Sequence, residues 1–205
     1  ARSGVAGFAL NKRGFICGGT TGTVSAVNER YDEKNDTWST RTAMATARQL
    51  LAAFVHSLAG YVAGGTTGTV SSVVEVHSDE TNTWLTAGSI SAARSGCAAA
   101  ETTNYAYVSG GTTGAVSAVH DQLDPTTNTF TAKTALTTAR QDLAASTVIA
   151  VHVFGGSTGT DSAVNERYSE AGNSWSTRTV MTTARDLLGA LLATEGITED
   201  AFSIG

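Results

Sequence analysis

A repeat of about 46 residues runs through the sequence and constrains the fold more than any other feature. A diglycine followed by a nearly constant Thr-rich loop returns at intervals of 46, 46 and 45 residues, and an Ala-Arg pair and an aromatic residue keep step with it. A fixed period of this length indicates a chain built from repeated supersecondary units. The diglycines are Gly18-Gly19, Gly64-Gly65, Gly110-Gly111 and Gly155-Gly156.

Each repeat has the pattern of four short β-strands. β-Branched and aromatic runs are separated by turn residues, and no stretch keeps a helical period. In the second repeat the pattern predicts strands near residues 50–56, 61–63, 70–77 and 83–86. The diglycine that ends the second strand permits positive φ, or close approach of a neighbouring sheet. Four strands per repeat, with each sheet covering the apolar face of the next, is the architecture of a β-propeller.

The order of landmarks within a repeat resembles the kelch repeat. In the first repeat they are Arg2, Phe15 three residues before the diglycine, Glu29, Tyr31 and Trp38. The resemblance covers essentially all 205 residues and implies an all-β kelch-type β-propeller segment with four four-stranded blades and a fifth half blade. The repeats are 1–46, 47–92, 93–138, 139–183 and a partial one at 184–205. Propellers commonly have roughly four to eight blades. We therefore expect this single domain to be part of a larger ring or longer chain, or a ring completed by further copies.

The repeated arginines and acids are interpreted as architecture. A guanidinium at each repeat start can bind strand-end carbonyls or pair with a third-strand carboxylate, fixing strand to strand or blade to blade. The alternative is an arginine ring that binds an anionic ligand near the axis. The fourth-strand aromatic, with Trp38 as the example, is expected to be a buried packing residue. These structural residues are Arg2, Arg48, Arg94, Arg140 and Arg185; Glu29, Glu75, Asp121 and Glu166; and Trp38, Trp84, Phe130 and Trp175.

The loop after each diglycine is the predicted contact surface. It offers a short rim of hydroxyl groups that can hydrogen-bond a partner or a glycan but forms no deep pocket. It is not a phosphate-binding loop, because it lacks the lysine and joins strand to strand. The candidate binding residues are Thr20, Thr21, Thr66, Thr67, Thr112, Thr113, Ser157 and Thr158. The acidic stretch at 194–201 is a further candidate contact, although charge clusters usually face water and a solvated turn is the favoured interpretation.

The histidines and cysteines show no catalytic or metal-binding pattern. His77 and His152 occupy positions that are aromatic in other repeats, so we expect semi-buried aromatic replacements. No histidine pair has zinc-ligand spacing. Cys17 and Cys97 stand at small-residue positions of non-adjacent repeats, which indicates packing rather than a disulfide. We therefore predict no metal site, no cofactor and no catalytic residue.

Composition limits the function classes further. The 13 Lys+Arg and 18 Asp+Glu give a charge of −5 without a basic block, which argues against nucleic-acid binding. The longest apolar runs are far shorter than the roughly 20 residues of a membrane-spanning helix, so we expect no membrane insertion. The monotonous short loops favour a non-enzymatic protein-binding or structural assembly scaffold. Its partner would be another protein or further copies of itself.

Two alternatives remain open. One is a carbohydrate-binding or carbohydrate-active kelch propeller, for which a cluster of acids, histidines and exposed aromatics around one rim would be the sign. The other is a repetitive subunit of an extracellular or virion structure, which the Thr-rich, Lys-poor composition suggests. With either reading we expect a soluble protein, extracellular or virion-associated.

Overall fold

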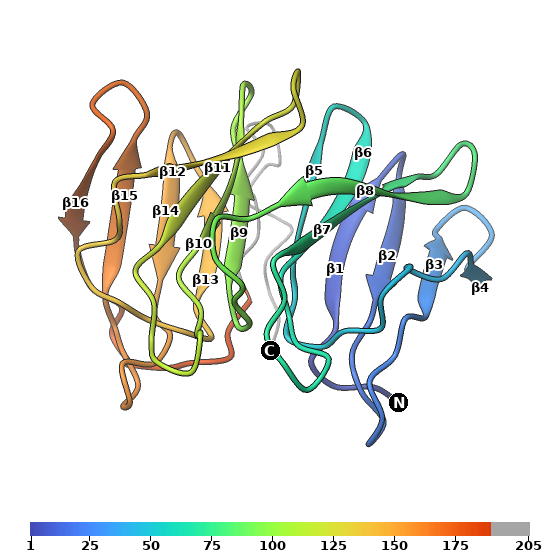
Figure 1. Cartoon of the computed structure of the whole chain (residues 1–205), viewed down its shortest axis with the longest axis horizontal. Helices are drawn as coiled ribbons and strands as arrows, with labels where there is room; N and C mark the ends of the chain where they lie inside the picture. Colours follow the sequence, from blue (N-terminus) through green and yellow to red (C-terminus); the bar gives the residue numbers. More distant parts are fainter. Residues whose placement is uncertain (190–205) are drawn as a thin grey trace.

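Four antiparallel sheets make up the chain. A computed structural model describes residues 1–189, in which sixteen β-strands and no helix are found. Each sheet has four strands in chain order, and we call the sheets blades 1 to 4 (Figure 1). The predicted all-β fold with four strands per repeat is confirmed. The acidic stretch at 194–201 and most of the expected half blade at 184–205 lie outside the described residues.

The strands of each blade recur at the period of the sequence repeat. Blade 1 contains β1 (Ala6–Leu10), β2 (Arg13–Cys17), β3 (Asn28–Asp32) and β4 (Thr37–Arg41). Blade 2 contains β5 (Ala52–His56), β6 (Ala59–Ala63), β7 (Val73–Ser78) and β8 (Thr83–Ser89). Blade 3 contains β9 (Ala98–Glu101), β10 (Ala106–Ser109), β11 (His120–Asp124) and β12 (Thr129–Lys133). Blade 4 contains β13 (Ala144–Thr147), β14 (Val151–Phe154), β15 (Asn165–Ser169) and β16 (Ser174–Arg178).

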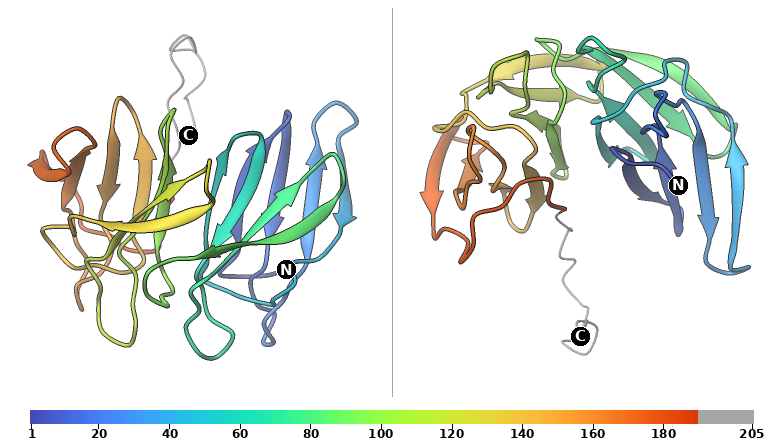
Figure 2. Two further views of the ribbon diagram at one scale, coloured as in Figure 1. Left: turned by 45° about the horizontal axis from the view of Figure 1, so that its top comes forward. Right: turned by 90° about the horizontal axis from the view of Figure 1, so that it is seen from below.

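The blades stand side by side on an arch. Seen from below, the first strands β1, β5, β9 and β13 lie on the inside, and the fourth strands lie on the outside (Figure 2). The first strands of adjacent blades contact one another, which places them around a common axis. This arrangement is propeller-like. Blades 1 and 4 stand at the two ends of the arch in the described part of the chain.

The apolar core is divided among the contacts between blades, which we call junctions 1/2, 2/3 and 3/4. Each junction contains its own cluster of buried side chains. At junction 1/2, Phe8 and Phe15 of blade 1 pack with Val62 of blade 2. At junction 3/4, Tyr107 of blade 3 packs with Val153 and Tyr168 of blade 4. Each blade therefore depends on its neighbour to cover an apolar face, as in other repeat proteins.

A chain of main-chain hydrogen bonds also links the blades. From the second repeat on, the residue two positions after the repeat arginine donates its N–H to the equivalent carbonyl of the preceding repeat, over distances of 2.8–2.9 Å. All five residues that take part in this series of hydrogen bonds have positive φ, including two leucines and an aspartate. The residues are Gly4, Leu50, Gly96, Asp142 and Leu187.

The diglycines behave as predicted. Gly65 has φ +92°, and a Cβ atom there would lie 2.8 Å from the carbonyl oxygen of Gln49 in the preceding connection. Gly64 would bring a Cβ to within 2.6 Å of the Arg94 carbonyl. Both the conformation and the available space therefore require glycine.

Candidate functional site

The repeat arginines join consecutive blades. The main chain of Arg48 belongs to blade 1, because its carbonyl accepts the Gly19 N–H at 2.8 Å. Its guanidinium enters blade 2, where it donates to the carbonyls of Gly64 at 2.6 Å and Val73 at 2.7 Å and to Glu75 Oε1 at 2.9 Å. Arg48 and Glu75 are both fully buried. Burial lowers the pKa of Arg48, while the Glu75 carboxylate opposes this effect.

Arg140 repeats this contact at junction 3/4, whereas Arg94 at junction 2/3 keeps the ion pair but makes no hydrogen bond to the diglycine carbonyl. Arg140 donates to the Gly155 carbonyl at 2.6 Å and to Glu166 at 2.5 Å. Arg94 pairs with Asp121 at 2.9 Å. All four side chains are buried, so these groups are unavailable to a ligand and the architectural interpretation is supported. Removing one partner of such a pair typically costs about 3–5 kcal/mol, because a buried charge is left without compensation.

The two outermost arginines differ from the buried three. Arg2 pairs with Glu29 in blade 1, but the Glu29 side chain is 43% exposed. Arg185 is exposed, and among residues 1–189 its side chain hydrogen-bonds only the Thr183 carbonyl, at 3.5 Å. No described blade follows Arg185 to supply the carbonyls and carboxylate that its equivalents bind.

The fourth-strand tryptophans bind the preceding blade. Trp84 Nε1 donates to the Thr42 carbonyl at 2.9 Å, and Trp175 Nε1 donates to the Thr134 carbonyl at 2.8 Å. The turn before each tryptophan completes the contact, since Asn82 Oδ1 accepts the Thr42 N–H at 3.2 Å. Asn173 Oδ1 accepts the Thr134 N–H at 3.0 Å in the same way. At each of these two junctions, one threonine therefore accepts a hydrogen bond from a tryptophan and donates one to an asparagine of the following blade.

The expectation of a buried fourth-strand aromatic is wrong in all four blades: Trp84, Phe130 and Trp175 are half-buried, and Trp38 is exposed. Its side chain is 59% exposed, and its ring contacts Tyr31 of the same blade at 5.3 Å. The reason is positional: no described blade precedes blade 1 to supply the carbonyl that Trp84 and Trp175 bind. Trp38 instead borders an open hollow of about 320 Å³ together with Arg2, Ile16 and Glu29. We call this surface the blade 1 outer face.

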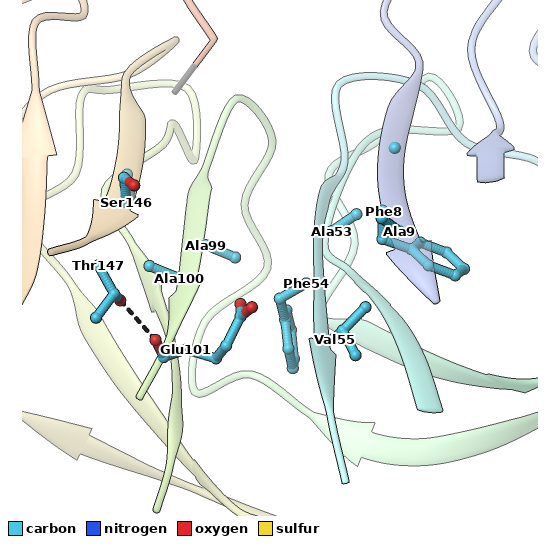
Figure 3. Close-up of a pocket in the computed structure, with 12 residues that line it drawn as sticks. Phe8, Ala9, Ala53, Phe54, Val55, Ala99, Ala100, Glu101, Ser146 and Thr147 are labelled. Atoms are coloured by element: carbon cyan, nitrogen blue, oxygen red, sulfur yellow. Dashed lines mark hydrogen bonds between the residues drawn. The ribbon is translucent and has the colours of Figure 1, made fainter. Parts of the chain in front are cut away.

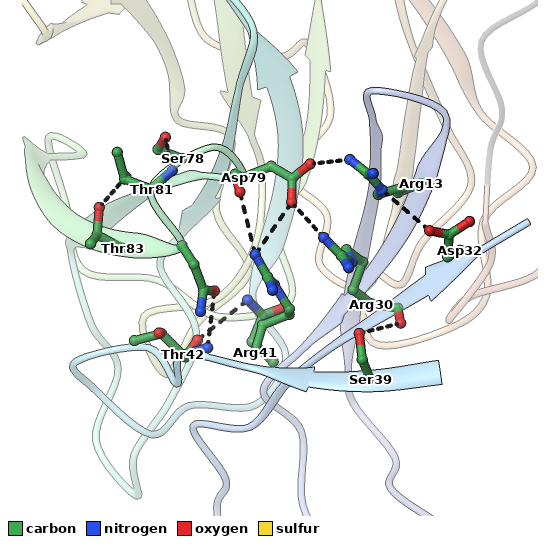
Figure 4. Close-up of polar contacts among 12 residues, drawn as sticks. Arg13, Arg30, Asp32, Ser39, Arg41, Thr42, Ser78, Asp79, Thr81 and Thr83 are labelled. Atoms are coloured by element: carbon green, nitrogen blue, oxygen red, sulfur yellow. Dashed lines mark hydrogen bonds and ion pairs between the residues drawn. The ribbon is translucent and has the colours of Figure 1, made fainter. Parts of the chain in front are cut away.

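A cluster of charged groups strengthens junction 1/2. Asp79 of blade 2 is buried and accepts hydrogen bonds from Arg13 at 2.9 Å and Arg30 at 3.2 Å (Figure 4). Arg41 donates to the Asp79 carbonyl at 3.3 Å. Burial raises the pKa of Asp79, but the arginine hydrogen bonds and charges outweigh this and hold it below its ordinary value. This cluster was not predicted from the sequence; comparing charged residues of adjacent repeats would have indicated it.

Blade 4 has the equivalents of two arginines of this cluster, but no described residue takes the place of Asp79. Arg167 and Arg178 are the repeat equivalents of Arg30 and Arg41. Among the described residues neither side chain has an ion-pair partner, and Arg178 is exposed. Thr179 corresponds to Thr42 and accepts a hydrogen bond from Asn165 within its own blade, at 3.2 Å. We call this surface, with Val180 exposed next to Thr179, the blade 4 outer face.

The predicted hydroxyl rim is present, one loop per blade. The first hydroxyl of each loop is half-buried and accepts the N–H of the loop glycine at 3.1 Å, so it serves the turn. These hydroxyls belong to Thr20, Thr66, Thr112 and Ser157. The second hydroxyl is exposed, and these belong to Thr21, Thr67, Thr113 and Thr158. The second set is the more accessible of the two to a partner.

An axial pocket of about 290 Å³ lies between the first strands of all four blades (Figure 3). Small side chains such as Ala53, Ala99 and Ala145 line it, together with Phe8 and other residues of β1, β5, β9 and β13. One carboxylate, that of Glu101, interrupts this lining. Glu101 was not predicted as a site residue from the sequence, although its repeat equivalents are uncharged.

The histidines and cysteines occupy packing positions. His77 is fully buried rather than semi-buried, and its ring lies 4.8 Å from Trp84. His152 is half-buried beside Phe154. Cys17 and Cys97 are buried free thiols, and burial raises the pKa of both. In residues 1–189, no group of three or more His, Cys, Asp or Glu side chains is arranged to hold a metal ion, and no helix is long and apolar enough to cross a membrane.

Comparison with known proteins supports the fold and no more. No protein-family model matches the chain, and no curated protein matches its sequence. Among solved structures, that of YjhT superposes with a TM-score of 0.81 at 12% identity, over 95% of this chain and 75% of YjhT. Similarity at this identity establishes a shared propeller-like arrangement of four-stranded sheets.

Proposed function

We propose that this chain is a non-enzymatic, kelch-type assembly scaffold that binds other blades through its outer faces. The observation that carries the proposal is the blade 1 outer face, which presents the contacts of an internal junction without their partner. Trp38 has no equivalent of the carbonyl to which Trp84 donates its indole N–H. Glu29 has no equivalent of the hydrogen bonds that Glu75 accepts from the Ala45 and Thr46 N–H groups.

The blade 4 outer face offers the complementary groups, which favours a further copy of the chain as the partner. By repeat position, the Thr179 carbonyl of one copy would accept the Trp38 indole N–H of the next copy. Arg167 and Arg178 would pair with Glu33, which is the repeat equivalent of Asp79. One place is already filled, because Arg2 occupies the slot that Arg185 of a docked copy would enter. Docking would therefore replace Arg2 at Glu29 by its repeat equivalent, Arg185 of the docked copy.

Sedimentation equilibrium over a range of protein concentrations tests this proposal. Wild-type protein is expected to self-associate, and Trp38→Ala is expected to weaken association without lowering thermal stability, since Trp38 is exposed. Leu58→Ala is the matched control, because Leu58 is 81% exposed in the β5–β6 turn.

Charge reversal makes the test specific for this pair of faces. Glu33→Arg and Arg178→Glu should each weaken association, and a protein carrying both changes should recover it. A wild-type chain that remains monomeric at every concentration would contradict the proposal, as would charge reversals without effect.

The carbohydrate alternative stays a prediction. The expected cluster of acids, histidines and exposed aromatics is not found in the axial pocket, whose lining contains one acid and no histidine. The extracellular or virion alternative depends on composition alone.

A further inference from the structure

Glu101 stands where the other blades place uncharged residues. The residue seven positions after the repeat arginine faces the axial pocket in every blade and is Ala9, Val55, Glu101 or Thr147. Two of these side chains bind the inner edge of the preceding blade. Thr147 Oγ1 donates to the Glu101 carbonyl at 2.5 Å, and the Glu101 carboxylate accepts the Val55 N–H. A serine or threonine hydroxyl could serve that structural purpose without introducing a charge.

The charge of Glu101 has no counterpart in the pocket. None of the lining residues is Lys, Arg or His, and no ion pair among the described residues includes Glu101. Burial raises its pKa, against the lowering effect of the hydrogen bonds from its own N–H and that of Val55. Phe54 also borders the pocket, but its ring is buried in the core of junction 2/3, where it stacks on Tyr61 at 5.0 Å (Figure 3). A partly buried carboxylate in an apolar pocket is costly unless a positive group joins it.

The pocket composition narrows the ligand chemistry. A metal ion would require several ligating side chains, and the described residues contain no such group. An anion would be repelled by Glu101. The volume of about 290 Å³ is at the low end for small-molecule sites, which limits the ligand to a small molecule. A carboxylate with alanine side chains around it suits an alkylammonium ion.

We propose that the axial pocket binds a small organic cation, a primary alkylammonium, with Glu101 as its counter-ion and the alanine side chains against its alkyl part. None of the residues that the assembly proposal uses lines this pocket, so the two proposals are tested by different variants.

An NMR titration of protein labelled with ¹³C at alanine methyl groups tests the proposal. The probe is n-butylammonium, and n-butanol and butyrate serve as neutral and anionic analogues of similar size. Saturable shifts are expected at Ala53, Ala99 and Ala145 with n-butylammonium. The two analogues are expected to bind about tenfold more weakly or not at all, because they cannot form a charge-assisted hydrogen bond with the carboxylate.

Matched variants separate the role of the charge from that of the fold. Glu101→Gln keeps an oxygen acceptor for the Val55 N–H and should lose n-butylammonium binding by about tenfold or more. Glu80→Gln removes the same charge from an exposed turn and should bind like the wild type. Equal binding of n-butanol, full binding by Glu101→Gln, equal loss in Glu80→Gln, or no saturable shift at these alanines would each overturn the proposal.

Discussion

At the scale of single residues, two separate demands act on the loop glycines. Gly68 has φ +113° and open space where a Cβ atom would stand, with no atom within 4 Å, whereas Gly65 has φ +92° and would place its Cβ 2.8 Å from a carbonyl oxygen. Gly68→Ala should therefore cost only the conformational term, about 1–2 kcal/mol. Gly65→Ala should cost a further 1–3 kcal/mol or so, because the neighbouring connection must move. Urea unfolding of both variants measures the difference, and equal losses would show that space does not matter at Gly65.

His120 is expected to make the fold acid-sensitive. Its ring lies 4.5 Å from Tyr168 and 4.8 Å from Trp175, and burial lowers its pKa to about 3. The folded protein therefore keeps His120 neutral, while the unfolded chain takes up a proton near pH 6.5. Stability should fall as the pH drops from about 6.5 toward 3, by up to about 1.4 kcal/mol per pH unit from this group.

The variant His120→Asn isolates this effect, because Asn28 and Asn165 occupy the same position in other blades. Urea unfolding between pH 7 and pH 4.5 should show a shallower loss of stability for His120→Asn than for the wild type. Parallel pH profiles would mean that His120 does not carry the acid sensitivity.

At the scale of strands and turns, the sequence predicted which elements exist better than where they begin. β5 starts at Ala52 rather than near residue 50, because Leu50 takes φ +54° and donates its N–H to Gly4 of the preceding repeat. β7 starts at Val73 rather than near residue 70, because Val70 pairs with Thr66 inside its own loop. Both shifts result from contacts between residues that periodicity within one strand does not show.

The turns before the fourth strands permit a measurement of one junction contact. Asn173 and Asp36 occupy equivalent positive-φ positions, and each accepts the hydroxyl of a tyrosine in its own blade, at 2.8 and 2.9 Å. Only Asn173 also accepts an N–H from a preceding blade, that of Thr134. Asn173→Ala should therefore cost about 1 kcal/mol more than Asp36→Ala, the typical value of one hydrogen bond. Thermal unfolding of the two variants tests this, and equal losses would show that the junction bond adds nothing.

At the scale of the whole molecule, residues at the same repeat position have different roles because their neighbouring blades differ. Trp38 and Trp84 share one position of the repeat, yet only Trp84 has a preceding blade to bind. Similarly, the repeat alignment shows that Glu101 is the one charged residue among Ala9, Val55, Glu101 and Thr147, but the structure is needed to show that these four residues line one axial pocket. A repeat predicts the blade and its internal contacts. It does not predict in which blades the residues of a junction contact lack a partner.

The same dependence on neighbours predicts how the molecule opens. In the described residues blades 2 and 3 each contact two blades, whereas blades 1 and 4 each contact one. If stability is a sum of blade and junction terms, Trp84→Ala, which removes a half-buried ring from junction 1/2, should weaken blade 1 selectively, by about 3 kcal/mol. Native-state hydrogen exchange should then show faster exchange in β1 and β2, and unchanged protection in β13 and β14 beyond two intact junctions. An equal rise in exchange across all four blades would instead show that the arch unfolds as one cooperative unit, and the additive description of its junctions would be wrong.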